Sequence, residues 1–316
     1  MAYLKIIIFG ILIELATLSN GGHSADDNWG YKPWNGPKTW PYRIPVSCAG
    51  QSQSPISIHQ DRTVFSPYLA PFRIHAKDRF TPPIPDRVFN NGRTVGVNVT
   101  NDPYISSGGL PVIYKTDHLH FHWGDMDHYG SEHTLNNKRA PLEMHLVTWD
   151  STTYGSVQEA AEHPEGVAVF SILFRLSPFD NPLLEPIVQS LPYVRDPEWH
   201  NHVNIPAVPI DQWLPKHPDM YYRYRGSFTT PTCNEGVIWT VFHNKQFVSH
   251  RQLNAFRNVL ALRQYLRKPV LVRHQSPLST FYRVVQAYKV VTKSRLVNNF
   301  RPLQALNGRI VYRSFL

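Results

Sequence analysis

Three histidines that lie close together in the sequence have the residue types of a metal site. His120 and His122 flank Phe121 in an apolar, β-rich stretch, and His145 lies in a second such stretch, Leu142–Trp149. Residues two apart on a strand point to the same face, so His120 and His122 would direct both imidazoles to one point. If the two strands pair antiparallel, His145 can supply a third imidazole. Three neutral imidazoles with an open fourth position are typical of a catalytic zinc site, where the pKa of a bound water falls to about 7.

Two alternatives share parts of this pattern. A single His-x-His pair on a strand is usually two ordinary histidines, and it is the third histidine that favours a metal site. Cupin barrels also bind metals through His-x-His, but with a glutamate a few residues later. Glu132 lies ten residues after His122, which fits that arrangement poorly. The pattern alone therefore favours a metal site without identifying the class of protein.

Longer motifs around the histidines resemble one family. The segments FHWG at 121–124, GSEHT at 130–134 and ExHLVxW at 143–149 look like the zinc-binding core of the animal α-class carbonic anhydrases. The similarity covers nearly everything from about Asn28 to the C-terminus. Further motifs that carry it are GSFTTP at 226–231, WGY at 29–31, QSPI at 53–56 and NFRPLQ at 299–304.

Short β-rich stretches recur along the 316 residues, a length that can bury one large core. They include Thr94–Val99, Val112–Tyr114, Val167–Leu173 and Gly236–Val241, and the clearest helix is expected over Ser249–Leu266. Periodicity alone indicates a mostly-β protein. The resemblance implies more: one α+β domain built around a large, mostly antiparallel, twisted β-sheet.

The resemblance also implies the reaction, which is the reversible hydration of carbon dioxide to bicarbonate and a proton. Zinc held by His120, His122 and His145 would generate the hydroxide that attacks carbon dioxide in an apolar pocket. Apolar residues more often serve only as core, so the substrate-binding positions rest on their match to the family. These positions are Val147, Val169, Phe228, Thr230, Val237 and Trp239.

Thr229 and Glu132 match a pair that orients the attacking hydroxide in the family. A threonine hydroxyl that donates to a carboxylate must accept a proton from the hydroxide, and this directs the hydroxide lone pair towards the substrate. Taken alone, the glutamate would be interpreted as a surface carboxylate and the threonine as a turn residue. Tyr31 and Asn91 match positions that order a chain of water molecules.

Two positions depart from the family pattern. Glu143 matches the carboxylate that supports the third zinc histidine, and Asn299 matches the residue whose backbone carbonyl supports the second. The first zinc histidine is normally supported by a glutamine, and here that position is His118. Arg93 follows Asn-Asn-Gly, where fast family members carry a proton-accepting histidine. Arginine stays charged and cannot shuttle protons. We therefore expect turnover that is limited by proton transfer and depends on buffer.

Several features indicate an extracellular setting. Residues 1–20 predict a secretory signal peptide, cleaved between residues 19 and 25, ahead of a domain over 26–316. The alternative is an uncleaved anchor, but the apolar run is short for a membrane span, and the C-terminus shows no lipid-anchor signal. We therefore expect a secreted protein without a transmembrane anchor. Asn98 begins an N-glycosylation sequon.

Cys48 and Cys233 are the two cysteines of the chain. In a reducing compartment both would be buried thiols, whereas an exported chain with an even count favours one disulfide. Extracellular members of the resembled family pair cysteines at these matching positions.

The formal net charge is +9, and it is unevenly distributed. From Gly236 onward there are 14 Lys and Arg and no acidic residue, so the rest carries 9 − 14 = −5. A basic insertion around 261–293, longer than the family usually has, predicts a hairpin of Pro269–His274 with Ser279–Thr292. The basic region suits an anionic matrix or mineral surface, or is simply a solvated face, and nothing in it favours nucleic acid. A matrix- or mineral-binding scaffold with weak or no catalysis is thus the alternative function, although such relatives generally lose a zinc histidine.

Overall fold

The computed structural model describes residues 29–75, 84–263, 265–276, 279–290 and 293–316. The expected signal peptide over 1–20, with its cleavage region, lies outside these residues. Within the described residues, no helix has both the length and the apolar character needed to cross a membrane.

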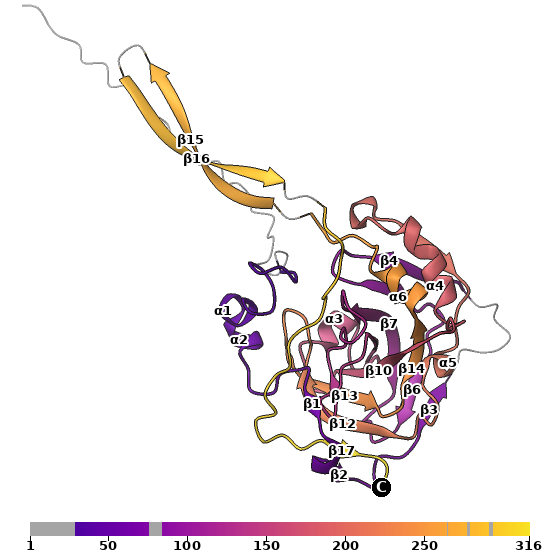
Figure 1. Cartoon of the computed structure of the whole chain (residues 1–316). Helices are drawn as coiled ribbons and strands as arrows, with labels where there is room; N and C mark the ends of the chain where they lie inside the picture. The colour runs from indigo at the N-terminus through magenta and orange to yellow at the C-terminus, as the bar shows by residue number, and fades with distance from the viewer. Residues whose placement is uncertain (1–28, 76–83, 264, 277–278, 291–292) are drawn as a thin grey trace, which may run out of the picture.

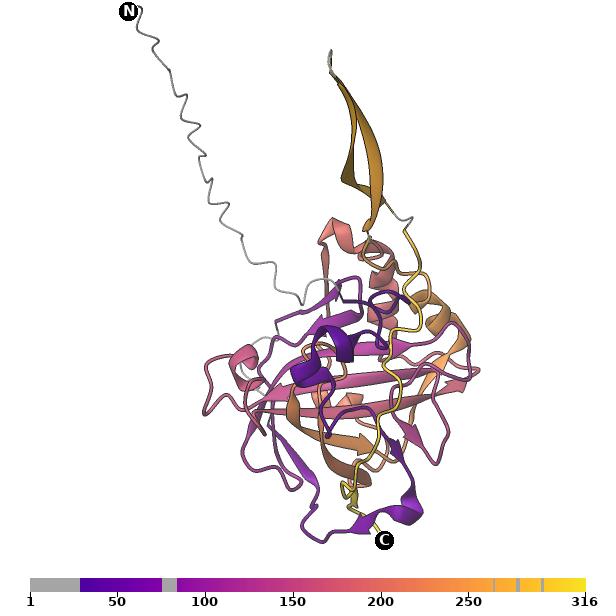
Figure 2. The same cartoon turned by 90° about the vertical axis from the view of Figure 1, so that its left-hand side faces the viewer.

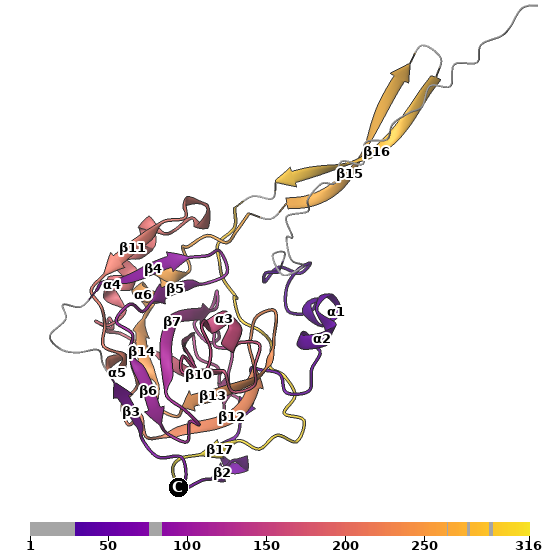
Figure 3. The ribbon, with the colours of Figure 1, turned by 180° about the vertical axis from the view of Figure 1, so that it is seen from behind.

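A 13-stranded sheet carries the three histidines on two neighbouring strands at its centre. From β5 to β12 its strands follow one another across the middle of the molecule (Figure 1, Figure 3). The main path of the sheet runs β11 (His202–Ile205), β4 (Asp86–Asn90), β5 (Val95–Asn98), β7 (Tyr114–Trp123), β9 (Leu142–Trp149), β10 (Val167–Ser177), β13 (Glu235–Phe242), β12 (Tyr221–Ser227), β17 (Tyr312–Arg313) and β2 (Val64–Phe65). The strands off this path are β14 (Gln246–Ser249), β3 (Phe72–His75) and β6 (Tyr104–Ser107).

Most pairings in this sheet are antiparallel, as expected. The parallel pairs are β10 with β13, β10 with β14, and β17 with β2. A separate two-stranded sheet pairs β1 (Ser57–Ile58) with β8 (Thr134–Leu135). The described helices are short: α1 (Trp40–Arg43), α2 (Pro45–Cys48), α3 (Val157–Ala160), α4 (Glu185–Ser190), α5 (Ile210–Trp213), α6 (His250–Phe256), and the 3-10 turns η2 (Gln60–Arg62), η3 (Leu191–Tyr193) and η4 (Pro197–Trp199).

The central strands are buried on both faces, because an apolar cluster covers each side. Phe121, Met144 and Phe170 belong to the larger cluster on one face. Val169 and Trp239 belong to the cluster on the other face, which is also the face of the histidines. Alternating side chains on β7, β9 and β10 therefore separate a structural core from the site.

The predicted boundaries need correction in two places. Of the expected strand Val112–Tyr114 only Tyr114 is in β7, since Val112 and Ile113 are exposed residues of the segment that leads into it. The helix expected over Ser249–Leu266 is wrong beyond α6. Its start is a capping box formed by Ser249 and Gln252. The helix ends at Phe256 in a short turn over 257–259, and from Leu260 onward the backbone bonds to other segments, as Leu260 N does to Arg195 O at 2.8 Å and Leu262 N to Gly92 O at 3.3 Å.

The basic insertion forms a hairpin, as predicted, but a longer one. β15 (Tyr265–Ser276) and β16 (Ser279–Val290) pair antiparallel along their whole length in a sheet of their own, with Pro269 opposite Gln286. The hairpin projects away from the rest of the molecule (Figure 1, Figure 2). Ion pairs lie at its base, where Arg263 contacts Glu198 at 3.0 Å and Lys293 contacts Asp196. Residues 291–292 of the predicted hairpin lie outside the described ones.

Candidate metal centre

The pairing of β7 with β9 brings the three histidines together. His120 is directly opposite His145, and their ring centroids are 5.2 Å apart. His122 lies two residues further along β7, with its ring centroid 4.5 Å from that of His145. Their ring nitrogens that could bind a metal lie within 4.8 Å of one another. His122 and His145 are buried, and His120 is partly buried.

The outward-facing ring nitrogen of each histidine has a partner. His122 Nδ1 donates to the carbonyl of Asn299 at 2.7 Å, and His145 Nε2 donates to Glu143 at 2.7 Å. His120 Nδ1 lies 3.0 Å from His118 Nε2. Each ring therefore has one nitrogen left to bind a metal ion. Two of these nitrogens, His122 Nε2 and His145 Nδ1, lie 3.1 Å apart. Three convergent imidazole nitrogens fit zinc.

Burial keeps these imidazoles neutral, as metal ligands must be. It lowers the pKa of His122 to about 4, against the opposing effect of the Asn299 carbonyl. Burial also lowers the pKa of His120 and of His145, with the neighbouring histidines acting in the same direction. The site is thus prepared to bind a cation without first releasing protons at neutral pH.

Glu143 is the anionic centre behind the ligands. Its buried carboxylate accepts from His145 and His133, both at 2.7 Å, and from the Ser171 hydroxyl at 2.7 Å. Burial raises the pKa of Glu143, but His133 and His145 outweigh that effect and hold it well below its usual range. A second group that could hold a metal, His133 with Glu143 and His145, is therefore already bonded within itself. The sequence interpretation gave His133 no role, although it follows Glu132 directly in the GSEHT motif.

Glu132 and Thr229 meet beside the ligands. Glu132 Oε1 accepts from the backbone N–H of Arg301 at 2.7 Å and lies 3.6 Å from His122 Nδ1. Its Oε2 is buried and has no partner with good hydrogen-bond geometry among the described residues. Burial raises the pKa of Glu132 to about 7, and the nearby Thr229 hydroxyl opposes that rise. An under-bonded buried oxygen beside three imidazoles fits a site built for a further polar group.

A row of side chains that is apolar beyond His118 borders the metal-site histidines on the same face of the sheet. His118, Val147, Val169 and Trp239 are successive cross-strand partners on β7, β9, β10 and β13. The Trp239 ring centroid is 4.9 Å from that of His145. Val237 and Phe228 pack into the same cluster, and Thr230 is partly buried in the loop after β12. Of the expected substrate-binding residues, Val147, Val169 and Trp239 therefore lie on the face of the histidines.

A profile of the eukaryotic-type carbonic anhydrases matches residues 35–315. The chain belongs to that family. It is 32% identical over 293 residues to human carbonic anhydrase 12, and the aligned region covers 91% of this chain and 73% of that relative. It is 31% identical over 290 residues to mouse carbonic anhydrase 7 and to human carbonic anhydrase 7, in each case over 91% of this chain and 97% of the relative.

The carbonic anhydrase carries an aromatic cluster where the water chain is expected. Tyr31 packs edge-on against Trp29 and Trp40, with ring centroids 5.9 and 5.8 Å away, and burial raises its pKa well above the usual value. The Asn91 side-chain oxygen accepts from the backbone N–H of Arg93 and of Thr94, each at 2.9 Å. Asn91 thus holds the turn that presents Arg93.

The disulfide expected in this carbonic anhydrase is present. Cys48 and Cys233 are joined with an S–S distance of 2.04 Å. The bond links the end of α2 to the loop that follows Thr229. Arg301 strengthens the same junction by donating to the Cys48 carbonyl at 3.2 Å and to Gln53 Oε1 at 2.8 Å. Arg301 lies in the NFRPLQ motif at 299–304, and its contacts join segments about 250 residues apart in the sequence, which local pattern does not predict.

Asn98, the sequon residue, ends β5 and is exposed. It is the cross-strand neighbour of His118, so it lies at the edge of the site. The sequon threonine, Thr100, donates to the Ile84 carbonyl at 2.8 Å.

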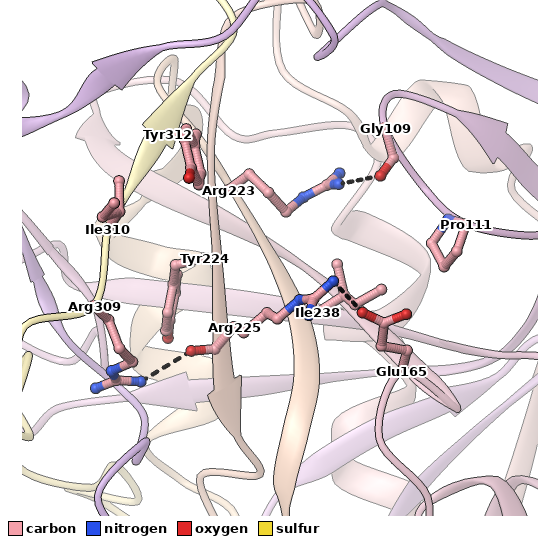
Figure 4. Close-up of a pocket in the computed structure, with 10 residues that line it drawn as sticks. All are labelled: Gly109, Pro111, Glu165, Arg223, Tyr224, Arg225, Ile238, Arg309, Ile310 and Tyr312. Carbon is pink, nitrogen blue, oxygen red and sulfur yellow. Dashed lines mark hydrogen bonds and ion pairs between the residues drawn. The ribbon is translucent and has the colours of Figure 1, made fainter.

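A cavity of about 550 Å³ lies elsewhere in the carbonic anhydrase, and none of the predicted site residues lines it. Its arginines are already bonded to neighbouring groups (Figure 4). Arg223 donates to the Gly109 carbonyl at 3.2 Å, Arg225 pairs with Glu165, and Arg309 donates to the carbonyl of Arg225 at 3.0 Å. The three arginines therefore stabilise the wall of the cavity, and they do not form a catalytic site.

Proposed function

We propose that this carbonic anhydrase is a zinc enzyme that hydrates carbon dioxide reversibly to bicarbonate and a proton. The observation that carries the proposal is the convergence of His120, His122 and His145, each with its outer nitrogen held by a partner. Zinc in such a site supplies hydroxide at neutral pH by lowering the pKa of water to about 7.

The chain's own residues supply orientation. Glu143, the carbonyl of Asn299 and His118 fix the three metal-binding rings. A Thr229 hydroxyl that donates to Glu132 keeps only its lone pairs for the attacking hydroxide, so it accepts a hydrogen bond and aims the nucleophile. Val147, Val169 and Trp239 provide an apolar surface next to it, which suits carbon dioxide and excludes competing water. Phe228, Val237 and Thr230 would complete that surface.

The test is stopped-flow hydration of carbon dioxide by the zinc-loaded protein over a series of imidazole concentrations. We expect activity that rises with imidazole, because Arg93 cannot accept the product proton. A protein that holds one zinc and shows no hydration above the buffer rate would refute the proposal and favour the scaffold function.

We also propose that the enzyme is secreted and glycosylated at Asn98. The disulfide supports this, because such bonds persist in oxidising compartments, and the exposure of Asn98 is compatible with a glycan. Expression of the full chain in secreting cells should place a processed protein in the medium, with a new N-terminus between residues 19 and 25 and a mass that falls on enzymatic deglycosylation. Retention of the full chain in the membrane fraction would contradict secretion.

The hairpin of β15 and β16 is the proposed site of attachment to an anionic matrix or mineral surface. Between residues 265 and 290 its sequence contains five basic residues and no acidic one. Because the hairpin forms a sheet separate from the 13-stranded sheet that carries the histidines, it can bind a surface without disturbing the metal centre.

A further inference from the structure

His118 connects a metal-binding histidine to a carboxylate. Its Nε2 lies 3.0 Å from Nδ1 of His120, and its own Nδ1 lies 2.6 Å from Oδ2 of Asp117. The rings of His118 and His120 are nearly parallel, with an interplanar angle of 27° and centroids 5.1 Å apart. Asp117 and His118 are both partly exposed, at 35% and 26% of their side-chain surface. The three side chains thus form one continuous line of contacts.

An irregularity in β7 makes this line possible. The pairing of β7 with β9 shifts between Thr116 and His118, so Asp117 is an extra residue with no partner on β9. In a regular strand, successive side chains point to opposite faces, and Asp117 would point away from the ring of His118. A β-bulge redirects one side chain locally, and bulges are common next to active sites. The bulge is held from the other side by the N–H of Val99, which donates to the Asp117 carbonyl at 3.2 Å.

The hydrogen positions follow from the chemistry of the groups. An ionised aspartate only accepts hydrogen bonds, so His118 Nδ1 must carry the hydrogen. A neutral imidazole with a hydrogen on Nδ1 has a bare Nε2, which can only accept. His120 must then donate from its Nδ1, and this leaves His120 Nε2 bare, which is the form a metal ion requires.

We propose that Asp117 and His118 are positioning residues that together fix the tautomer and ring orientation of His120 for metal binding. The proposal rests on the zinc site proposed above. An amide would act on His120 in one step, through its oxygen. An imidazole cannot do so alone, because its two tautomers are nearly equal in energy and one of them would point a hydrogen at His120. Asp117 removes that ambiguity, and its charge makes the imidazole a better acceptor.

The test is a comparison of zinc affinities in two backgrounds, measured by competition with a chromogenic chelator, with the visible spectrum of the cobalt-substituted protein as a second readout. Asp117→Ala should weaken zinc binding roughly tenfold and alter the cobalt spectrum. His118→Gln should bind zinc about as well as the parent, because its amide oxygen can accept directly from His120. In the His118→Gln background, Asp117→Ala should have no further effect.

A matched control is Asp102→Ala. Asp102 lies in the loop before β6 and pairs with Lys115 of β7 at 2.9 Å. This variant therefore removes a carboxylate that contacts β7 without touching the histidines, and zinc affinity should be unchanged. Equal losses from Asp117→Ala in both backgrounds would overturn the proposal, since they would mean that Asp117 acts on the fold and not through His118. Zinc binding without hydration would refute the proposed function and leave this inference standing. A parent protein that binds no zinc would overturn both.

Discussion

The guanidinium of Arg93 lies 4.4 Å from the centre of the Trp29 ring, and Arg93 Nε donates to the Trp29 carbonyl at 3.2 Å. The carbonyl of Arg93 in turn accepts from the side chain of Asn299 at 3.1 Å, the residue whose carbonyl supports His122. Arg93 therefore packs the N-terminal aromatic cluster against the segment behind the metal centre. A residue held in this way contributes to packing, and its permanent charge prevents it from accepting a proton.

Arg93→His should create a proton acceptor at this position. We expect hydration at low buffer concentration to rise by at least about tenfold, because a positioned general base typically contributes a factor of ~10²–10⁴. The stimulation by added imidazole should shrink accordingly. Arg93→Lys is the control, since it keeps a positive charge and adds no acceptor near neutral pH. Stopped-flow traces of Arg93→His with the same rate and the same imidazole dependence as the parent would show that proton transfer does not pass this position.

Thr229→Ala should lower hydration by about two orders of magnitude, which is the usual loss when one orienting hydrogen bond is removed from a reaction site. Thr229→Ser keeps a hydroxyl and should retain most of the activity. Zinc content should stay at one per chain in both variants, because neither changes a ligand. Near-parental activity of the alanine variant would exclude the orienting role of Thr229.

Replacing both cysteines by alanine should lower the free energy of unfolding by several kcal/mol. The bond closes a loop with a sequence separation of 185, for which chain entropy sets an upper limit of about 5 kcal/mol. Urea denaturation measures the loss, and the reduced parent protein should match the double variant. A variant with the parental midpoint would show that Gln53 and Arg301 hold the junction without the bond.

Deleting the hairpin should separate attachment from catalysis. A chain in which residues 265–290 are replaced by a short Gly-Ser turn should hydrate carbon dioxide within about twofold of the parent, because surface charges act over only ~10 Å at 0.1 M. It should elute from a heparin column at lower salt, because five basic residues are removed. Changing Arg267, Lys268 and Arg273 to glutamine preserves the strands and should shift elution in the same direction. Unchanged elution of the deletion variant would place the attachment surface elsewhere.

The metal-free enzyme should lose stability as the pH falls below about 6.5. In the folded apo-protein the pKa of His122 is about 4, against 6.5 as its ordinary value. Between these values the unfolded chain binds a proton that the folded chain does not, so unfolding becomes easier by up to roughly 3 kcal/mol. Thermal melts of the apo-protein against pH measure this slope. His122→Gln has no such proton to bind and should show a shallower slope, and equal slopes would contradict the assignment.

Local pattern was enough to predict some of these features. The period of two on β7 put His120 and His122 on one face, and the resemblance correctly implied the family, the mostly antiparallel sheet and the disulfide. Features that depend on distant or irregular backbone were missed. The bulge at Asp117 breaks the strand period, and the helix does not continue to Leu266 because Leu260 and Leu262 bond to Arg195 and Gly92. Helical propensity over 257–266 depends on local sequence alone and therefore could not predict contacts with distant segments.

The donation from His122 Nδ1 to the Asn299 carbonyl spans 177 residues, and the donation from Arg301 N to Glu132 spans 169. The second metal-binding histidine, His122, is therefore synthesised long before the group that orients it, whereas His118 and Glu143 lie within two residues of the ligands that they support. Pairings this far apart in the chain form slowly, since a large loop must close first. On the ribosome the histidines emerge into a nascent protein in which nothing yet holds the second of them. The metal centre is therefore complete only after the C-terminal segment has packed against β7.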